Sequence, residues 1–260
     1  MAVINTNIGA MRAANSSNSA ASMLGTAQLR LSTGKRINTA KDDAAGLAIS
    51  TSMTAQINGM NQGVRNANDG ISLAQTAEGA LNEVTNMLQR VRELAVQSTS
   101  GTYQSSDRTN MQQEVTSLTS QVNSVLANTK FNGVALFSTT AGSNLTFVIQ
   151  AGANAADVVN ITSLAIDGTK INATALDVTT AALATTTLGN VDTALAQVAN
   201  TNASLGGGES QLQSAINNLT SNSTNLSDAR SRIMDADYSA ETTALAKAQI
   251  LSQASTAMIA

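Results

Sequence analysis

The sequence contains no cysteine, proline, histidine or tryptophan. Without cysteine the chain can form no disulfide and has no thiol nucleophile. Without histidine it lacks the commonest general base and the commonest metal ligand. Without proline every residue keeps its backbone donor, so nothing forces a helix to break. A chain with so few catalytic side chains points to assembly rather than to enzymatic chemistry, and we expect no cofactor.

Large rings are also scarce, because aromatic residues make up only 2% of the chain. The hydrophobic content of 42% nevertheless excludes a disordered tail. Most of it is alanine, leucine, isoleucine, valine and methionine, which suits thin helical seams. The net charge is −3, and no cluster of Lys and Arg predicts a nucleic-acid partner. No apolar run is long enough for membrane insertion, and the N-terminus does not resemble a cleaved secretory signal.

Apolar residues recur with heptad spacing in both halves of the chain. In the second half they stand at Val191, Val198, Leu205, Leu212, Leu219, Leu226 and Ile233. In the first half they stand at Met53, Ile57, Met60, Val64, Ala67, Ile71 and Ala74, and after a phase slip near Glu78 at Leu81, Val84, Leu88, Val91 and Ala95. Such spacing over many turns predicts long helices packed as a coiled coil or bundle.

The remaining segments are assigned from local patterns. Asp42 or Asp43 is expected to cap the long helix that runs to about Ser98. The expected helical segments are residues 1–35, 44–98, 104–128, 188–235 and 236–260. Between the third and fourth of these, residues 138–187 are rich in Thr, Ala, Asn and Gly. The sequence therefore predicts a mainly α fold with a small β-containing insert.

Within the insert, Leu145, Phe147 and Ile149 alternate with polar or smaller residues. A second short apolar run follows at residues 158–161. This alternation predicts a short hairpin. Because the insert shows no heptad phase, we expect it to be exposed to solvent and to tolerate a small insertion near Gly152.

Several motifs along the chain resemble those of bacterial flagellin. They occupy residues 1–7, 31–38, 40–46, 89–97, 131–133, 229–238 and 247–251. They stand in the order expected for that family, and the resemblance covers roughly residues 1–137 and 188–260.

The resemblance implies a D0 domain built from both termini, residues 1–43 and 236–260. It also implies a D1 domain of long antiparallel helices, residues 44–137 and 188–235, with residues 138–187 as the variable outer insert. Flagellins of this kind usually continue for several helical turns beyond the position of Ala260. We therefore expect the C-terminal end of this chain to be trimmed.

The resemblance further implies a secreted structural subunit that polymerises into the filament used for swimming. Its expected partners are copies of itself, the type III export apparatus and its chaperone, the filament cap and the hook-associated proteins. The terminal stripes are thin, so we expect them to fold on assembly, when neighbouring subunits cover them. The predicted assembly seam consists of Ile4, Ile8, Met11, Leu24, Leu31, Leu245, Leu251 and Met258.

A second predicted surface comprises Arg90, Arg92, Glu93, Leu94 and Glu114. Charged helix positions of this kind ordinarily form a solvated face. In flagellins, however, the corresponding motif is bound by the flagellin-sensing Toll-like receptor of animal hosts, and the same surface packs against the next subunit.

The alternatives to a filament subunit are a hook–filament junction protein of the same export class, an enzyme such as a flagellin with a metalloprotease insert, and an unrelated coiled-coil adhesin. The absence of His and Cys removes the usual zinc sites and His-based triads. Asp235 and Asp237 are more readily explained as a charged helix surface than as a metal site.

Glycines inside the first long helix leave two interpretations open. They stand at Gly59, Gly63, Gly70 and Gly79. Each lowers helix stability by about 1 kcal/mol relative to alanine. They either permit close contact with another helix or reflect tolerated drift.

Overall fold

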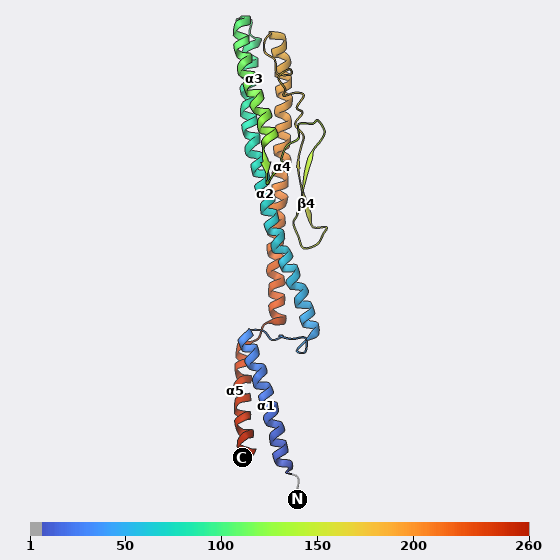
Figure 1. The fold of residues 1–260 in the computed structure, drawn as a ribbon, viewed down its shortest axis with the longest axis vertical. Coiled ribbons are helices and arrows are strands. Elements are labelled where there is room, and N and C mark those ends of the chain that lie inside the picture. The colour runs from blue at the N-terminus through green and yellow to red at the C-terminus, as the bar shows by residue number, and fades with distance from the viewer. Residues whose placement is uncertain (1–6, 260) are drawn as a thin grey trace. The chain divides into compact units, whose positions relative to one another are not determined.

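The computed structural model describes residues 7–259, with side chains to Ala257, as five helices and two small antiparallel sheets (Figure 1). The helices are α1 (Ile8–Thr33), α2 (Ala44–Thr99), α3 (Ser105–Asn128), α4 (Ala181–Met234) and α5 (Tyr238–Ile259). The strands are β1 (Lys130–Phe131), β2 (Val134–Ala135), β3 (Leu145–Gln150) and β4 (Val158–Ser163). This content confirms the predicted mainly α fold with a small β element.

The chain divides into two compact units. One contains the residues up to Asn58 together with those from Asn222 onward, and the other is Gly59–Ser221. The division therefore falls inside α2 and α4, and each of these long helices contributes to both units. The predicted D0 and D1 boundaries lie instead near the breaks between helices, and that assignment stays a prediction.

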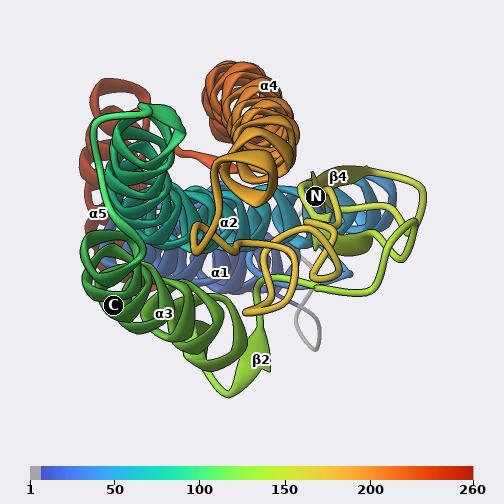
Figure 2. The same cartoon turned by 90° about the horizontal axis from the view of Figure 1, so that it is seen from above.

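The core of the 59–221 unit is built on the predicted heptad stripes of α2 and α4. Leu81 and Leu88 of α2 and Leu205 and Leu212 of α4 are all fully buried. They belong to one hydrophobic cluster, which also contains Val115 and its buried neighbours on α3. In the view from above, α2, α3 and α4 appear as neighbouring columns (Figure 2). Burial of the stripes fixes which face of each helix turns inward.

Helix α4 begins at Ala181, about two turns before the predicted start at residue 188. The early turns are rich in threonine, whose helix propensity is low. Tertiary packing overrides that preference, because Ala184 and Thr187 are fully buried and continue the stripe of Val191 toward the N-terminus. The Thr187 hydroxyl also donates a hydrogen bond to the carbonyl of Asp177 at 2.7 Å.

The predicted hairpin is present, since β3 and β4 pair in antiparallel register from Leu145 opposite Ser163 to Gln150 opposite Val158. The expectation that the insert is a solvent-exposed excursion is wrong. Five of its apolar residues are fully buried in the same cluster as the helix stripes: Ile161, Ile166, Ile171, Leu176 and Val178. The last four of these follow neither a helical nor a strand period, which is why periodicity did not reveal them. Val148 and Val158 of the hairpin are the exposed large apolar positions of the segment.

After β4 the chain runs along the helices without strand pairing, and we call residues 164–180 the strap. Side chains from the helices take the place of a partner strand. The Gln112 amide of α3 accepts from Val178 N at 2.6 Å and donates to the Leu176 carbonyl at 3.2 Å. Asn123 donates to the Ile171 carbonyl at 2.9 Å. Further bonds to the strap come from Thr187, Asn190, Gln197 and Thr201 of α4 and from Ser98 of α2.

Three of the four α2 glycines lie under the hairpin. A Cβ atom at Gly63 would lie 2.8 Å from Gly152 N, and one at Gly59 would lie 2.7 Å from the Cβ of Ala153. At Gly70 it would meet Leu212 of α4 at 2.9 Å and Ile149 of β3 at 3.0 Å. Gly79 has nothing within 4 Å of such an atom. The close-contact interpretation thus holds for three positions, mainly against the hairpin and its loop, and not for Gly79.

Gly63→Ala and Gly79→Ala form a matched pair that tests this packing. Gly63→Ala should lower the free energy of unfolding by about 1–3 kcal/mol, because the added methyl meets backbone that cannot rotate away. Gly79→Ala should raise it by about 1 kcal/mol through helix propensity alone. Urea unfolding followed by circular dichroism gives both values, and an equal gain in the two variants would contradict the close approach.

The preferred position for a loop insertion moves from Gly152 to Gly142. Gly152 is buried against α2, whereas Gly142 lies in an exposed turn with φ of 75° and nothing near its Cβ position. A short Gly-Ser insertion after Gly142 should leave the urea midpoint unchanged, and the same insertion after Gly152 should lower it. The reverse order of midpoints would show that the 151–157 loop is not anchored.

Candidate assembly surfaces

Helices α1 and α5 pack together through small side chains (Figure 1). The buried positions of α1 are Ala13, Ala20 and Ala27, which recur every seven residues. On α5 the buried residues are Ala248 and Ser255, again seven apart. Small residues at these positions let two helix backbones approach closely, but each buries little apolar area. The seven-residue spacing of these small side chains is present in the sequence, but the predicted stripe was assigned to larger apolar residues instead.

Three of the six described residues of the predicted seam are exposed rather than buried in this contact. Ile8, Met11 and Leu251 are 47%, 55% and 39% exposed. The remaining described members are half-buried: Leu24, Leu31 and Leu245. Ile4 lies outside the described residues, as does the side chain of Met258. The α1–α5 pair therefore leaves much of its larger apolar surface open to solvent.

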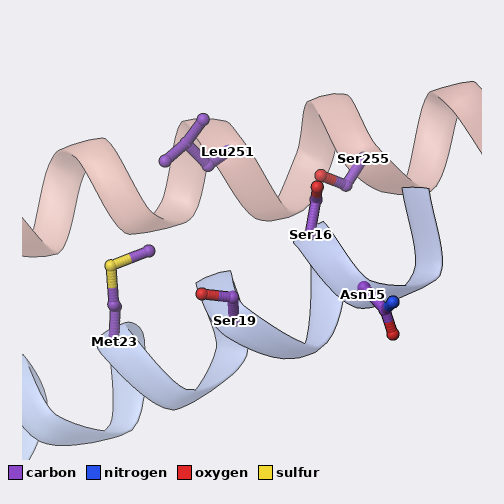
Figure 3. A pocket seen from close by; sticks show the side chains of 6 residues that line it. All are labelled: Asn15, Ser16, Ser19, Met23, Leu251 and Ser255. Atoms are coloured by element: carbon purple, nitrogen blue, oxygen red, sulfur yellow. The ribbon is translucent and has the colours of Figure 1, made fainter. Parts of the chain in front are cut away.

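A groove of about 360 Å³ runs between the two helices, lined by Asn15, Ser16, Ser19, Met23, Leu251 and Ser255. Figure 3 shows Met23 reaching from α1 toward α5 and Ser16 directed toward Ser255. Short serine side chains line this groove where a larger residue would fill the space. The groove mixes hydroxyl groups with two large apolar side chains, so it suits a helix surface better than a small charged ligand.

An ion pair joins the last turn of α1 to the first turn of α5. Arg30 Nη1 lies 3.1 Å from Glu241 Oε1, with side-chain exposures of 30% and 13%. Each charge also suits its own helix end, since a cation stabilises a C-terminus and an anion an N-terminus. Sequence reasoning did not identify this pair, because its two members are far apart along the chain.

Two backbone hydrogen bonds, which we call the clasp, join the segments that connect this helix pair to α2 and α4. Arg36 N donates to the Met234 carbonyl at 2.6 Å, and Ala236 N donates to the Gly34 carbonyl at 3.0 Å. Gly34 has φ of 69°, a left-handed conformation that ends α1 and turns the chain into the clasp. The clasp therefore fixes the separation of the N-terminal and C-terminal segments at this point.

The two acidic residues before α2, Asp42 and Asp43, have different hydrogen-bond partners. Asp43 is the cap, because its Oδ1 accepts from Gly46 N at 2.8 Å. Asp42 instead accepts from the backbone N–H groups of Thr39 and Asn38, at 2.9 and 3.1 Å. These hydrogen bonds, with that from Thr39 first, hold the pKa of Asp42 below its ordinary value.

The predicted arginine surface of α2 forms charge pairs with both neighbouring helices. Arg90 Nε lies 2.8 Å from Glu114 Oε1 of α3, and Arg90 Nη1 lies 2.9 Å from Glu93 Oε2. Arg92 Nε lies 2.8 Å from Asp192 Oδ1 of α4, a partner that sequence reasoning missed. The hydrogen bond to Glu114, followed by that to Glu93, raises the pKa of Arg90. All of these side chains remain about half exposed, so the pairs orient the surface more than they stabilise the fold.

Leu94 does not belong to this surface. It is 3% exposed and lies in the hydrophobic cluster of the 59–221 unit, on the same inward face of α2 as Val91. The apolar residue that does reach solvent here is Val96, which is 49% exposed. Val96 lines a shallow groove of about 440 Å³ together with Gln89, Arg92 and Glu93. The helical period separates these outward positions from Leu94.

Neither a metal cluster nor a membrane span is found in the part of the chain that the structure describes. No described group of three or more acidic, cysteine or histidine side chains could hold a metal. No described helix is both long and apolar enough to cross a bilayer. Asp237, one of the two acids weighed as a metal ligand, accepts from the backbone N–H groups of Ser239 and Ala240 and so caps α5.

Two protein-family models match the sequence. The bacterial flagellin N-terminal helical region matches residues 4–142, and the bacterial flagellin C-terminal helical region matches residues 188–260. Between the two matches lie residues 143–187, which contain β3, β4 and the strap. The helices and surfaces described above therefore fall almost wholly within the matched regions, and the strap falls outside them.

Individual relatives agree with the family models. A flagellin of Serratia marcescens is 49% identical over 178 residues, covering 68% of this chain and 50% of that protein. A flagellin of Salmonella typhimurium is 51% identical over 159 residues, covering 61% of this chain and 31% of that protein. The chain thus spans half or less of the length of these relatives. The crystal structure of Bacillus cereus flagellin matches with a TM-score of 0.50 at 29% identity, covering 64% of this chain and 94% of that one.

Leu94→Ala and Arg90→Ala should separate the core from the surface of α2. Leu94→Ala should lower the free energy of unfolding by about 2–5 kcal/mol, because it opens a cavity in the cluster. Arg90→Ala should change it by less than about 1 kcal/mol, because its ion pairs are half exposed. Thermal and urea unfolding measure both, and similar losses in the two variants would contradict this assignment.

Proposed function

Because the chain belongs to the bacterial flagellin family, we propose that it is a structural subunit that polymerises into the flagellar filament used for swimming. The observation that carries the proposal is the match of both terminal helical regions to that family, in order. The α1–α5 pair supports it, since large apolar residues there remain uncovered in the single chain. A filament subunit works by self-association and needs no catalytic group.

In the proposed assembly, α1 and α5 of neighbouring subunits cover the exposed apolar residues of each pair. Burial contributes about 25 cal/mol for each Å² of apolar area removed from water. The alanine and serine contact inside a single pair buries little such area, while ordering each residue costs about 1–2 kcal/mol. Neighbouring subunits would add the area that Ile8, Met11 and Leu251 expose, so the terminal helices would become fully ordered on assembly.

We further propose that the surface formed by Arg90, Arg92, Glu93 and Glu114 contacts the next subunit and, in the monomer, a host Toll-like receptor. Its charge pairs hold the side chains in fixed positions across α2, α3 and α4. Val96 adds exposed apolar area beside them. Leu94 would act only from the core, by keeping α2 in place.

The subunit would leave the cell through the flagellar type III apparatus with a chaperone. It would then meet the hook-associated proteins and the filament cap outside the cell. The alternative is a hook–filament junction protein of the same export class. The curated relatives reported above are named flagellin, which favours the filament subunit. Copolymerisation with flagellin along the filament, rather than binding at its base alone, distinguishes the two.

Met11→Glu tests the proposed seam. The added charge should reduce polymer yield at least severalfold in a seeded assembly followed by sedimentation and electron microscopy, because Met11 would have to enter an apolar contact. Gln28→Glu, at another exposed position of α1, is the control and should assemble like the original chain.

Both variants should keep the urea midpoint of the unchanged monomer. If Met11→Glu assembles as well as Gln28→Glu, Met11 is not in the seam. If the unchanged chain does not extend flagellar filament seeds at all, the proposed function itself is wrong.

A further inference from the structure

A pair of carboxylates interrupts the apolar contact between α2 and α4 in the 59–221 unit. Glu78 of α2 stands where the heptad stripe slips in phase, and Glu209 of α4 follows three consecutive glycines. A Cβ atom at Gly206 would lie 3.7 Å from Glu78 Oε1. The Glu78 carboxylate therefore lies over the turn of α4 that leads directly into Glu209.

The site is short of hydrogen-bond donors. Glu209 Oε1 is buried and receives no hydrogen bond from the protein. An ionised carboxylate can only accept hydrogen bonds. The unpartnered Glu209 oxygen and the Glu78 carboxylate thus lie in neighbouring turns of the α2–α4 contact. Asn202 Oδ1, which is also buried without a partner, lies about two turns earlier on the same side of α4, and its amide group carries donors of its own.

The surroundings provide no compensating positive charge. Burial, and after it the nearby Glu78, raises the pKa of Glu209, and no cation acts in the opposite direction. Strands β3 and β4, which pack on α4 through Ile161 beside Gly208, carry no charged residue. The nearest other acids on α2, Asp69 and Glu83, are exposed.

We propose that Glu209 and Glu78 form a proton-binding site within the α2–α4 contact. When Glu209 takes up a proton, its carboxyl group becomes a donor and its repulsion with Glu78 disappears. The proton therefore supplies a donor at the buried Glu209 oxygen. The contribution of this site to the stability of the 59–221 unit is more favourable in mild acid than at neutral pH, and it is a property of the single chain that does not depend on assembly.

The direction of the pH effect follows from the linkage between proton binding and folding. The folded chain binds this proton more tightly than the unfolded chain, in which the pKa of Glu209 has its ordinary value of 4.5. Ionised Glu209 therefore destabilises the fold at neutral pH, and this penalty disappears as the pH falls through the raised pKa toward 4.5. The factor by which folding raises the proton affinity of Glu209 is also the factor by which its ionised form lowers the folding equilibrium constant at neutral pH.

Glu209→Gln removes the charge, keeps the shape and adds a donor, so it tests the site directly. At pH 7 the variant should resist urea better than the original chain, and this advantage should shrink steadily as the pH is lowered to 4.5. Glu83→Gln is the matched control, because Glu83 is exposed on α2, and its difference from the original chain should not follow that course. Equal pH profiles for the two variants would overturn the proposal.

A second measurement does not depend on stability. Carbon NMR of glutamate-labelled protein follows the titration of each side-chain carboxyl group in the folded monomer. Glu209 should titrate above its ordinary value, and Glu78→Gln should bring its pKa down again. Titration of Glu209 at or below 4.5 would remove the site, and an unchanged pKa in Glu78→Gln would show that burial acts alone, without a shared pair.

Discussion

The core of the 59–221 unit depends on apolar side chains that reach it from outside the helices. With aromatic residues at only 2% of the chain, the stripes of α2, α3 and α4 are thin rows of leucine and valine. Ile166, Ile171 and Leu176 of the strap are fully buried among them. Burying a side chain of this size contributes about 1.5–3 kcal/mol. The strap is therefore part of the core, and its irregular backbone is tolerated because Gln112, Asn123 and other helix side chains satisfy its hydrogen bonds.

The same chain uses a different packing rule at its ends. Between α1 and α5 the buried positions hold alanine and serine, so the pair buries little apolar area and leaves its larger residues uncovered. In the 59–221 unit leucine, isoleucine and valine are buried together with alanine, and a glycine such as Gly63 admits the backbone of Gly152. The α1–α5 pair therefore leaves apolar area exposed in the single chain, whereas the 59–221 unit buries its core without a partner. In the proposed filament, neighbouring subunits would cover the area that the pair exposes.

Residue spacing was sufficient to predict the long helices α2 and α4 and their inward faces, but not the small-residue contact between α1 and α5. Leu81, Val84 and Leu88 are buried as their spacing demands, and the alternation in β3 correctly indicated a hairpin. The strap could not be predicted, because an irregular segment of turns and bends held by helix side chains has neither a helical period nor a strand partner. Leu94 was misplaced because a sequence motif groups neighbours along the chain, whereas helix geometry turns Leu94 inward and its neighbour Glu93 outward.

Glu209 differs from the buried polar side chains of the helices because it has no hydrogen-bond donor of its own when ionised. Many threonine and serine side chains of the helices donate to a carbonyl one turn earlier, as Thr85 does to Leu81. Others donate to the strap, as Thr187 does to Asp177, or to β4, as Ser204 does to Thr162. Such residues bring their own donors and can be buried without charge. Glu209 brings only acceptors, and its neighbour Glu78 does the same. In a chain without histidine, a raised carboxyl pKa is one of the few means by which a buried contact can respond to mild acid. The phase slip at Glu78 therefore coincides with the point where, in our proposal, protonation of Glu209 changes the stability of the α2–α4 contact.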